Sequence, residues 1–286
     1  MSAPSAPDSP PAAPTCYRHP GRPTYVRCNR CERYICGDCM RSAAVGQQCV
    51  ECVRAGARTV RQPRTRFGGR QRSATPVLTY ALIAINVLAF VLASGSLGKQ
   101  LALWPPAVAD GQVYRLVTSA FLHYGVAHLL FNMWALYVVG PPLEIWLGRM
   151  RFGALYALSG LGGSVLVYLL SPLDTATAGA SGAIFGLFGA TFVVGKRLAI
   201  DVRWVVVVIG INLIFTFGVP VISSQRISWQ AHVGGLVTGG LVAVAYVYPP
   251  RQGRNVIQAA VTIIVLAVFA VLIWWRTAQI FAEFSA

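Results

Sequence analysis

The chain has 286 residues, of which 55% are hydrophobic and only 12% are charged, and its mean hydropathy is +0.58. These values exclude an ordinary soluble globular protein, in which about a quarter of the residues are charged, and indicate a chain that lies mostly in a membrane. The net charge of +15 would point to nucleic acid in a soluble protein, but in a membrane protein basic residues first report orientation.

The residues before the first long apolar run divide into three parts. Residues 1–14 are almost entirely Ser, Ala and Pro, which cannot bury apolar area, so we expect a disordered tail. Residues 15–54 hold all seven cysteines of the chain, and residues 55–74 form a basic linker without an acidic residue. No cleavable signal opens the chain, so the first apolar run is expected to target it to the membrane.

The cysteines fall into pairs whose partners are separated by two residues, and a histidine completes the first pair. Tetrahedral zinc takes four nitrogen or sulfur ligands, and a Cys-x2-Cys turn presents two of them at once. So short a segment cannot fold on a hydrophobic core alone, and bound metal would supply the missing free energy. The expected ligands of two structural zinc ions are Cys16, His19, Cys28, Cys31, Cys36, Cys39, Cys49 and Cys52.

Disulfides are the alternative for this module, but seven is an odd number and His19 would have no role in them. The order of ligands resembles a B-box or related cross-brace zinc finger. That resemblance implies that the first ligand pair joins the third and the second joins the fourth, with pairing of neighbours as the alternative. Closed four-ligand sites are structural, so we expect the finger to bind a cytoplasmic protein partner. The basic linker is expected to meet anionic membrane lipid rather than nucleic acid.

Seven apolar runs follow, at residues 76–94, 121–143, 151–171, 181–195, 203–219, 229–248 and 256–275. Several reach the ~20 residues needed to cross about 30 Å of hydrocarbon. If the N-terminus lies inside, the outer segments hold only four of the 24 Lys and Arg residues, namely Lys99, Arg115, Arg226 and Arg276. This distribution obeys the positive-inside rule and predicts a cytoplasmic N-terminus and an external C-terminus.

The predicted fold is an all-α polytopic membrane protein. Residues 75–250 are expected to form a six-helix core, and residues 251–286 a seventh transmembrane helix with a short external tail. The connection over residues 94–120 mixes apolar and aromatic residues with few charges, which suits an element in the membrane interface. A plain solvated loop is the alternative for this connection.

Four polar side chains stand out inside the apolar runs, where polar groups are costly and functional by default. His128 and Asn132 are four residues apart and therefore share one face of the second helix. Ser181 opens the fourth run, and His232 lies early in the sixth. A helical rise of about 1.5 Å per residue places all four in the outer half of the membrane, so we expect them to share a site.

Small residues recur at every fourth position beside Ser181 and His232, which predicts that the fourth and sixth helices pack closely. These ridges are Gly182, Gly186 and Ala190 on one helix and Ala231, Gly235, Gly239 and Ala243 on the other. In the simplest interpretation Ser181 only caps its helix and His232 only bonds across the bundle.

The chemical interpretation is acyl transfer. A serine hydroxyl is a weak nucleophile that a neutral histidine can activate, so Ser181 and His232 form the expected catalytic dyad. No carboxylate lies at their depth, and packing by Phe185 could orient the imidazole instead. His128, Asn132 and the backbone N–H of Ser181 are the expected donors to an oxyanion.

Three motifs together resemble the rhomboid intramembrane serine proteases. They are Gly179-Ala180-Ser181-Gly182, Ala231-His232-Val233-Gly234-Gly235, and His123 with the run His128-Leu129-Leu130-Phe131-Asn132. The resemblance covers about residues 76–250 and implies a six-helix core with an outward-opening cavity. It also implies that Ser181 is the nucleophile, that His232 is the base, and that His128, Asn132 and the Ser181 amide form the oxyanion hole.

The resemblance further implies single-pass transmembrane proteins as substrates, cut near the outer membrane face. Tyr114-Arg115 resembles the aromatic-Arg loop of the family, although Trp is commoner at the first position. Phe185 stands where members often have Tyr, which keeps the stacking and removes a hydroxyl. No cofactor is expected for catalysis, and the expected location is the plasma membrane of a bacterium.

Two other functions are possible for such a chain. A catalytically inactive rhomboid-like protein would bind membrane helices as a chaperone or trafficking factor, but such proteins usually lack the Ser or the His. A transporter would need buried ionisable coupling groups, and no carboxylate lies at the middle of the membrane.

Overall fold

The computed structural model describes residues 12–59, 64–69, 75–93, 95–222 and 227–285. It divides into two compact units, residues 1–62 and residues 63–286. Most of the expected tail lies outside the described residues, as do residues 60–63 and 70–74 of the expected linker.

The first unit is built from short elements around a core made mostly of cysteine. Ile35 is the one fully buried side chain in that core that is not a cysteine, among the residues described. So small an apolar cluster is insufficient to stabilise a fold in water. Its elements are the antiparallel pairs β1 (Thr15–Cys16) with β2 (His19–Pro23) and β3 (Met40–Ser42) with β4 (Gln47–Cys49), the 3-10 turn η1 (Gly37–Cys39) and α1 (Val50–Thr59).

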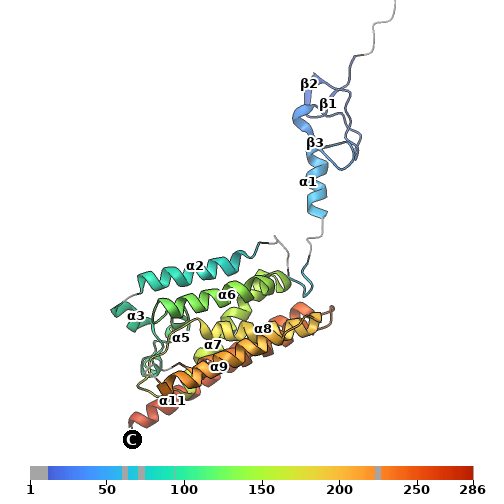
Figure 1. Cartoon of the computed structure of the whole chain (residues 1–286). Coiled ribbons are helices and arrows are strands. Elements are labelled where there is room, and N and C mark those ends of the chain that lie inside the picture. The colour runs from blue at the N-terminus through green and yellow to red at the C-terminus, as the bar shows by residue number, and fades with distance from the viewer. Residues whose placement is uncertain (1–11, 60–63, 70–74, 94, 223–226, 286) are drawn as a thin grey trace, which may run out of the picture. The chain divides into compact units, whose positions relative to one another are not determined.

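The second unit is a bundle of long helices that run side by side (Figure 1). Among the described residues each of the seven apolar runs forms one long helix, in the predicted order. They are α2 (Val77–Leu92), α6 (Val126–Leu147), α7 (Arg149–Leu170), α8 (Ser181–Leu198), α9 (Arg203–Ile222), α10 (Trp229–Val247) and α11 (Arg254–Ser285).

Four of these helices, α6, α7, α10 and α11, are long and apolar enough to cross a membrane. α2 and residues 203–217 of α9 are shorter apolar helices. α8 is the most enclosed helix, because it packs against α6, α7, α9 and α10 and buries the unbroken stretch 182–191. The predicted all-α polytopic fold is confirmed.

α8 and α10 approach each other until their backbones touch, as the ridges of small residues predict. A Cβ atom added to Gly235 would lie 1.8 Å from the carbonyl oxygen of Gly182, and one added to Gly239 would lie 2.2 Å from that of Gly186. Both distances are far inside van der Waals contact. Glycine at these positions therefore determines how closely the two helices that carry Ser181 and His232 can pack.

Gly235→Ala is expected to destabilise the bundle by about 1–3 kcal/mol, because the added methyl group pushes α10 away from α8. Gly240→Ala is the matched control on the same helix, since no atom lies within 4 Å of a Cβ there. Thermal unfolding of both variants in detergent checks the expectation. Equal midpoints for the two variants would contradict this close packing.

The connection before α6 is structured rather than a plain solvated loop, so that alternative is wrong. Leu103 and Thr177 exchange backbone hydrogen bonds of 2.9 and 2.8 Å, which join the connection to the loop before α8. The buried Arg115 donates from Nη1 to the carbonyls of Lys99 and Ala102, at 2.9 and 2.8 Å. The elements of this connection are α3 (Ser96–Leu101), α4 (Pro105–Ala109), α5 (Arg115–Thr118) and the 3-10 turn η2 (Ser119–Phe121).

α11 is attached to the bundle by its few polar groups. The Gln258 amide donates to the carbonyl of Tyr246 at 2.7 Å, and the hydroxyls of Thr262 and Tyr246 lie 2.7 Å apart. Thr277 makes a similar 2.7 Å contact with Tyr168. The helix continues to Ser285, although the apolar run predicts an end near residue 275. The seventh helix is therefore an integral part of the bundle.

Candidate functional site

Ser181 and His232 are brought into one region by the contact between α8 and α10. Each has a neighbour at the crossing point: a Cβ on Gly182 would lie 3.2 Å from the carbonyl oxygen of Ala231. Ser181 is the first residue of α8, Ala180 occupies the N-cap position, and no side chain caps this helix. Ser181 is thus not a capping serine, and its hydroxyl is available for another role.

Gly179 allows the ring of His128 to reach the loop that carries Ser181. Its φ of +144° lies in a region that favours glycine, and a Cβ there would sit 3.1 Å from His128 Nε2 and 3.5 Å from Ser181 Oγ. The N–H of Gly179 donates to the carbonyl of Ser119 at 2.9 Å, which holds the loop. The imidazole of α6 and the hydroxyl of α8 therefore flank the same glycine.

Hydrogen bonding determines which nitrogen of His128 carries the proton. The backbone N–H of Tyr124 donates to His128 Nδ1 at 3.4 Å, so Nδ1 is an acceptor. In a neutral imidazole the other nitrogen then carries the hydrogen. Nε2–H is therefore the donor of His128, and this is the atom beside Gly179 and Ser181.

Asn132 lies one turn below His128 on α6, as predicted, and is only 6% exposed. The Asn132 amide donates one hydrogen to the carbonyl of His128 at 2.8 Å, while its other hydrogen has no partner among the described residues. His123 packs edge-on against His128, with ring centroids 5.1 Å apart. His128 and Asn132, one turn apart on α6, thus each offer one N–H donor, and that of His128 lies beside Gly179.

His232 is 6% exposed and lies flat on Phe185, with ring centroids 4.1 Å apart and an angle of 9° between the planes. The predicted packing of Phe185 on the imidazole is confirmed. Nδ1 lies 3.0 Å from the hydroxyl of Thr216 on α9. Within the described residues His232 and Ser181 make no direct hydrogen bond, and such contacts in ligand-free sites are often long.

Thr216 is the contact of His232 that sequence reasoning missed. A signal for it exists, because Asn212 and Thr216 are spaced four residues apart in the apolar run 203–219 and so share one helix face. The rule that intramembrane polar groups are functional by default applies to this pair as well.

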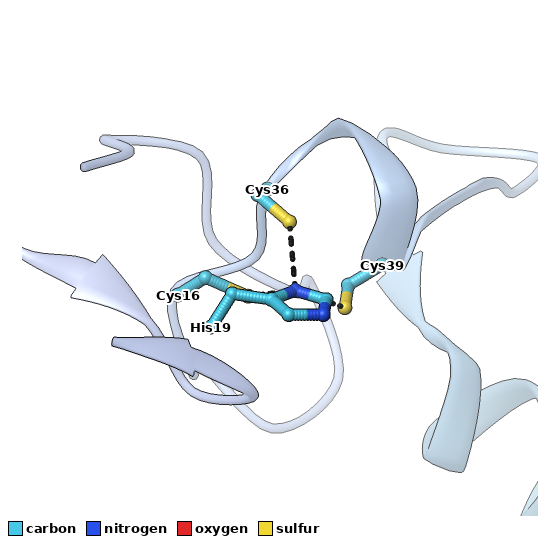
Figure 2. A group of neighbouring side chains, drawn as sticks. All are labelled: Cys16, His19, Cys36 and Cys39. Carbon is cyan, nitrogen blue, oxygen red and sulfur yellow. Dashed lines mark hydrogen bonds between the residues drawn. The ribbon is translucent and has the colours of Figure 1, made fainter. Parts of the chain in front are cut away.

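The first cysteine cluster joins the first and third ligand pairs (Figure 2). His19 Nδ1 lies 3.8 Å from the sulfur of Cys16, 3.3 Å from that of Cys36 and 3.5 Å from that of Cys39. A tetrahedral zinc ion with bonds of about 2.0–2.3 Å separates its ligand atoms by about 3.3–3.8 Å. The four groups are therefore spaced for one such ion.

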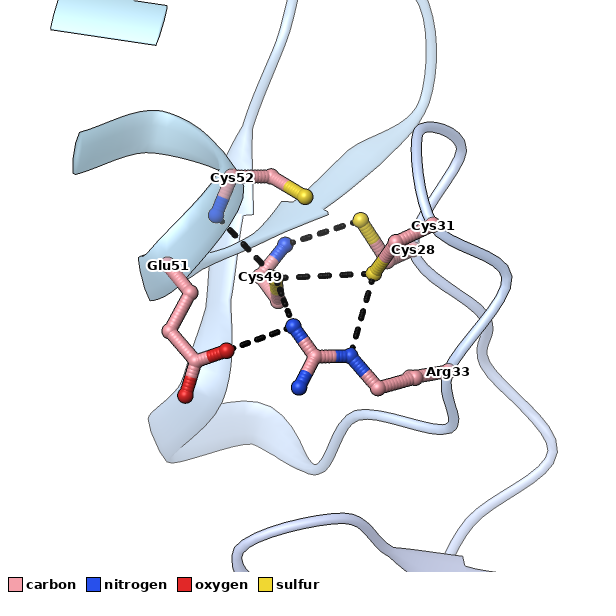
Figure 3. A network of polar contacts seen from close by, with 6 residues as sticks. All are labelled: Cys28, Cys31, Arg33, Cys49, Glu51 and Cys52. Atoms are coloured by element: carbon pink, nitrogen blue, oxygen red, sulfur yellow. Dashed lines mark hydrogen bonds and ion pairs between the residues drawn. The ribbon is translucent and has the colours of Figure 1, made fainter. Parts of the chain in front are cut away.

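The second cluster holds Cys28, Cys31, Cys49 and Cys52 (Figure 3). The sulfurs of Cys31 and Cys49 are 3.8 Å apart, and backbone N–H groups donate to Cys28 and Cys49 at 3.2 and 3.3 Å. All seven cysteines are free. The cross-braced grouping is confirmed and the pairing of neighbours is wrong, so each of the two groups could hold one metal ion.

Arg33 places a positive charge against the second cluster. Its Nε–H donates to the sulfur of Cys31 at 3.3 Å and its Nη2 to that of Cys49 at 3.7 Å, while Glu51 holds the guanidinium from the other side. The bond from Arg33 keeps the pKa of the Cys31 thiol below its ordinary value. Thiolates are the metal-binding form of cysteine, so Arg33 favours the ligand state.

Arg33→Met is expected to weaken zinc binding at the second cluster by about 10- to 100-fold, the usual effect of losing a group that bonds to metal ligands. Competition with a chromogenic chelator measures it. Arg41→Met is the matched control, because within the described part of the chain the Arg41 guanidinium donates to the backbone carbonyls of Asp38 and Met40 and to no cysteine. Equal affinities for the two variants would contradict a role for Arg33.

Comparison with known proteins connects these features to one family. A family model described as "Rhomboid domain" matches residues 110–249. The chain is 36% identical to "Rhomboid protease GluP" of Bacillus subtilis (strain 168) over 208 residues, which cover 68% of this chain and 39% of that protein. It is 35% identical to "Putative rhomboid protease YdcA" of the same organism over 182 residues, 59% of this chain and 87% of that protein.

A plant relative, "RHOMBOID-like protein 5" of Arabidopsis thaliana, is 34% identical over 168 residues, 55% of this chain and 52% of that protein. The chain therefore spans well under two thirds of some of these relatives and most of another. The matched region contains Ser181, His232, His128 and Asn132, whereas the cysteine clusters lie before it. Together with the apolar helices, these similarities indicate an integral, multi-pass membrane protein.

Proposed function

Because the chain belongs to the rhomboid family, we propose that it is an intramembrane serine endopeptidase that cleaves single-pass transmembrane proteins near the outer membrane face. The observation that carries the proposal is the approach of α6 and α8 at Gly179 together with the contact of α8 and α10 at Gly182. His128 Nε2 from α6 and Ser181 Oγ from α8 flank Gly179, and on α10 the residue before His232, Ala231, lies against Gly182, the residue after Ser181.

In the proposed reaction Ser181 Oγ attacks the carbonyl carbon of the substrate while His232 Nε2 takes the hydroxyl proton. The carbonyl oxygen becomes an oxyanion, for which His128 Nε2–H, the free amide hydrogen of Asn132 and the backbone N–H of Ser181 are the donors. That last N–H lies at the start of α8, where the helix leaves it without an internal partner and the helix dipole favours negative charge.

The tetrahedral intermediate then collapses, the C–N bond breaks, and His232 returns the proton to the leaving amine. Water attacks the acyl-enzyme by the same route in reverse, with His232 again as base. The small residues of α8 and α10 support this chemistry by leaving little room for the two helices to move.

Reconstitution in liposomes with a tagged single-pass substrate tests the proposal. We expect two products whose new termini map near the outer membrane face. A folded protein that binds the substrate helix without cutting it would instead favour the helix-binding alternative.

We also propose that the first unit is a B-box-like finger that holds two structural zinc ions, one in each cross-braced cluster. The support is the spacing of the ligand atoms, all within 4.8 Å of one another in each group. Bound zinc would supply the free energy that the small core lacks. We propose that the finger binds a cytoplasmic protein partner.

The proposed orientation places the N-terminus in the cytoplasm and the C-terminus outside, in the plasma membrane of a bacterium. Its support is the basic residues, of which only Lys99, Arg115, Arg226 and Arg276 fall in outer segments. Reporters fused to the N-terminus and to the C-terminus are expected to lie on opposite sides of the membrane. A C-terminal reporter in the cytoplasm would mean that α11 does not cross, and would overturn the assignment.

A further inference from the structure

The imidazole of His232 makes two contacts, a stack on its face and a hydrogen bond at its edge. The face of the ring rests on Phe185, while Nδ1 points to Thr216 Oγ1 at 3.0 Å. Thr216 is 2% exposed, on the inward side of α9, whereas Ile214, Phe215 and Phe217 beside it are exposed. Thr216 is therefore a buried polar side chain in direct contact with the proposed base.

The direction of the hydrogen bond follows from the second contact of Thr216. Its Oγ1 also lies 2.7 Å from the backbone carbonyl oxygen of Asn212. A carbonyl oxygen cannot donate, so the single hydrogen of the Thr216 hydroxyl belongs to that bond. Toward His232 the hydroxyl oxygen can then only accept, and Nδ1 must carry a hydrogen.

The proton on Nδ1 determines the chemistry at the opposite end of the ring. A neutral imidazole has one N–H, so Nε2 is left with a free lone pair. That lone pair is the base which the proposed reaction needs. The other tautomer would place a hydrogen on Nε2 and could not accept the proton of Ser181.

Stacking on Phe185 cannot make this choice, because a flat ring contact has no preference between nitrogen and carbon at the ring edge. A half-turn of the ring about its Cβ–Cγ bond would exchange Nδ1 for Cδ2 while the stack stayed intact. The hydroxyl of Thr216 distinguishes the two orientations, since only Nδ1–H donates a conventional hydrogen bond to it.

We propose that Thr216 is a positioning residue that holds His232 in the tautomer with its proton on Nδ1, in the place that an aspartate takes in a serine-protease triad. The inference rests on the proposed function for its catalytic consequence. A neutral oxygen suits this depth, because an ionised carboxylate in hydrocarbon is costly. The Thr216 hydroxyl fixes the tautomer of His232, but unlike an aspartate it supplies no negative charge to balance the imidazolium.

Two substitutions and a control separate this role from a merely structural one. Thr216→Val keeps the shape of the side chain and removes the acceptor, whereas Thr216→Ser keeps the acceptor. Thr191→Val is the matched control, because Thr191 is a buried threonine on α8 that makes the same kind of bond, 2.7 Å to the carbonyl of Leu187, and has no hydrogen bond to a histidine among the described residues.

The tautomer is read by ¹⁵N NMR of the full-length protein with labelled histidine, with the His232 signals assigned through His232→Gln. We expect wild type and Thr216→Ser to show Nδ1 protonated and Nε2 bare, and Thr216→Val to show a mixture or the other tautomer. Thr191→Val is expected to match wild type. An unchanged tautomer in a folded Thr216→Val variant would overturn the proposal.

Kinetics supply the second measurement. Thr216→Val is expected to lower kcat about 10-fold with KM unchanged, the scale of one lost hydrogen bond, and Thr216→Ser to restore it. A change in KM alone, or an equal fall of kcat in Thr191→Val, would overturn the proposed effect of Thr216 on catalysis. If wild type cleaves no substrate, the proposed function fails, and the NMR result still decides whether Thr216 sets the tautomer.

Discussion

Ser181→Ala is expected to lower the turnover of a transmembrane substrate by about 10⁶-fold, to the background of the assay, because it removes the atom that forms the acyl-enzyme. His232→Ala is expected to cost nearly as much. The double variant is expected to be no slower than either single variant, since nucleophile and base act as one unit. Rates of purified, reconstituted variants measure all three.

Asn132→Ala provides a graded comparison in the same assay. One oxyanion donor is typically worth about 10²- to 10³-fold in rate, so this variant should keep measurable activity. Thermal unfolding must be followed in parallel, because Asn132 also bonds to the carbonyl of His128 within α6. A folded Ser181→Ala variant that cleaves substrate at the wild-type rate would exclude the serine-protease mechanism.

Removal of metal is expected to unfold the first unit completely. Zinc bound to finger peptides contributes about 10–16 kcal/mol of apparent free energy at neutral pH, more than the few buried side chains around Ile35 can replace. Metal analysis of the full-length protein should give two zinc ions per chain. Cys36→Ser and Cys28→Ser should each lose one, since these cysteines belong to different clusters.

The helix bundle provides the control for this experiment. Residues 63–286 form a separate compact unit that contains Ser181 and His232, so substrate cleavage in detergent is expected to survive deletion of residues 1–55. One zinc ion or none under reducing conditions would contradict the assignment of eight ligands. Loss of turnover in a truncated but folded protein would mean that the finger completes the active site.

The sequence predicts the helices and their closest contact because these depend on local patterns. Apolar runs locate the seven helices, and glycines at every fourth position mark where α8 and α10 touch. The cysteine spacing identifies the ligand pairs, although the cross-braced grouping follows only from the resemblance to known fingers. In each case the pattern itself, an apolar run, a glycine repeat or a cysteine pair, lies within one short stretch of the sequence.

Contacts between distant segments were harder to predict. The bond between Thr216 and His232 depends on how α9 is rotated about its axis. The spacing of Asn212 and Thr216 marks one polar face of this helix, but it does not say which neighbouring helix that face meets. The carbonyl of Phe67, in the expected linker, accepts from Gln258 at 3.4 Å, and a backbone acceptor leaves no trace in side-chain patterns. α11 continues past its apolar run, and the extension is packed rather than free, because Ile280 is buried in a cluster with Leu103 and Tyr168 from other parts of the chain.

A fluorophosphonate probe tests the central claim most directly, because it reacts only with a serine whose hydroxyl has been activated as a nucleophile. Mass spectrometry of the labelled full-length protein is expected to find one adduct, on Ser181, that is absent from Ser181→Ala and from His232→Ala. A folded protein that takes up no probe, or takes it up only at another residue, would contradict the assignment of Ser181 as the nucleophile.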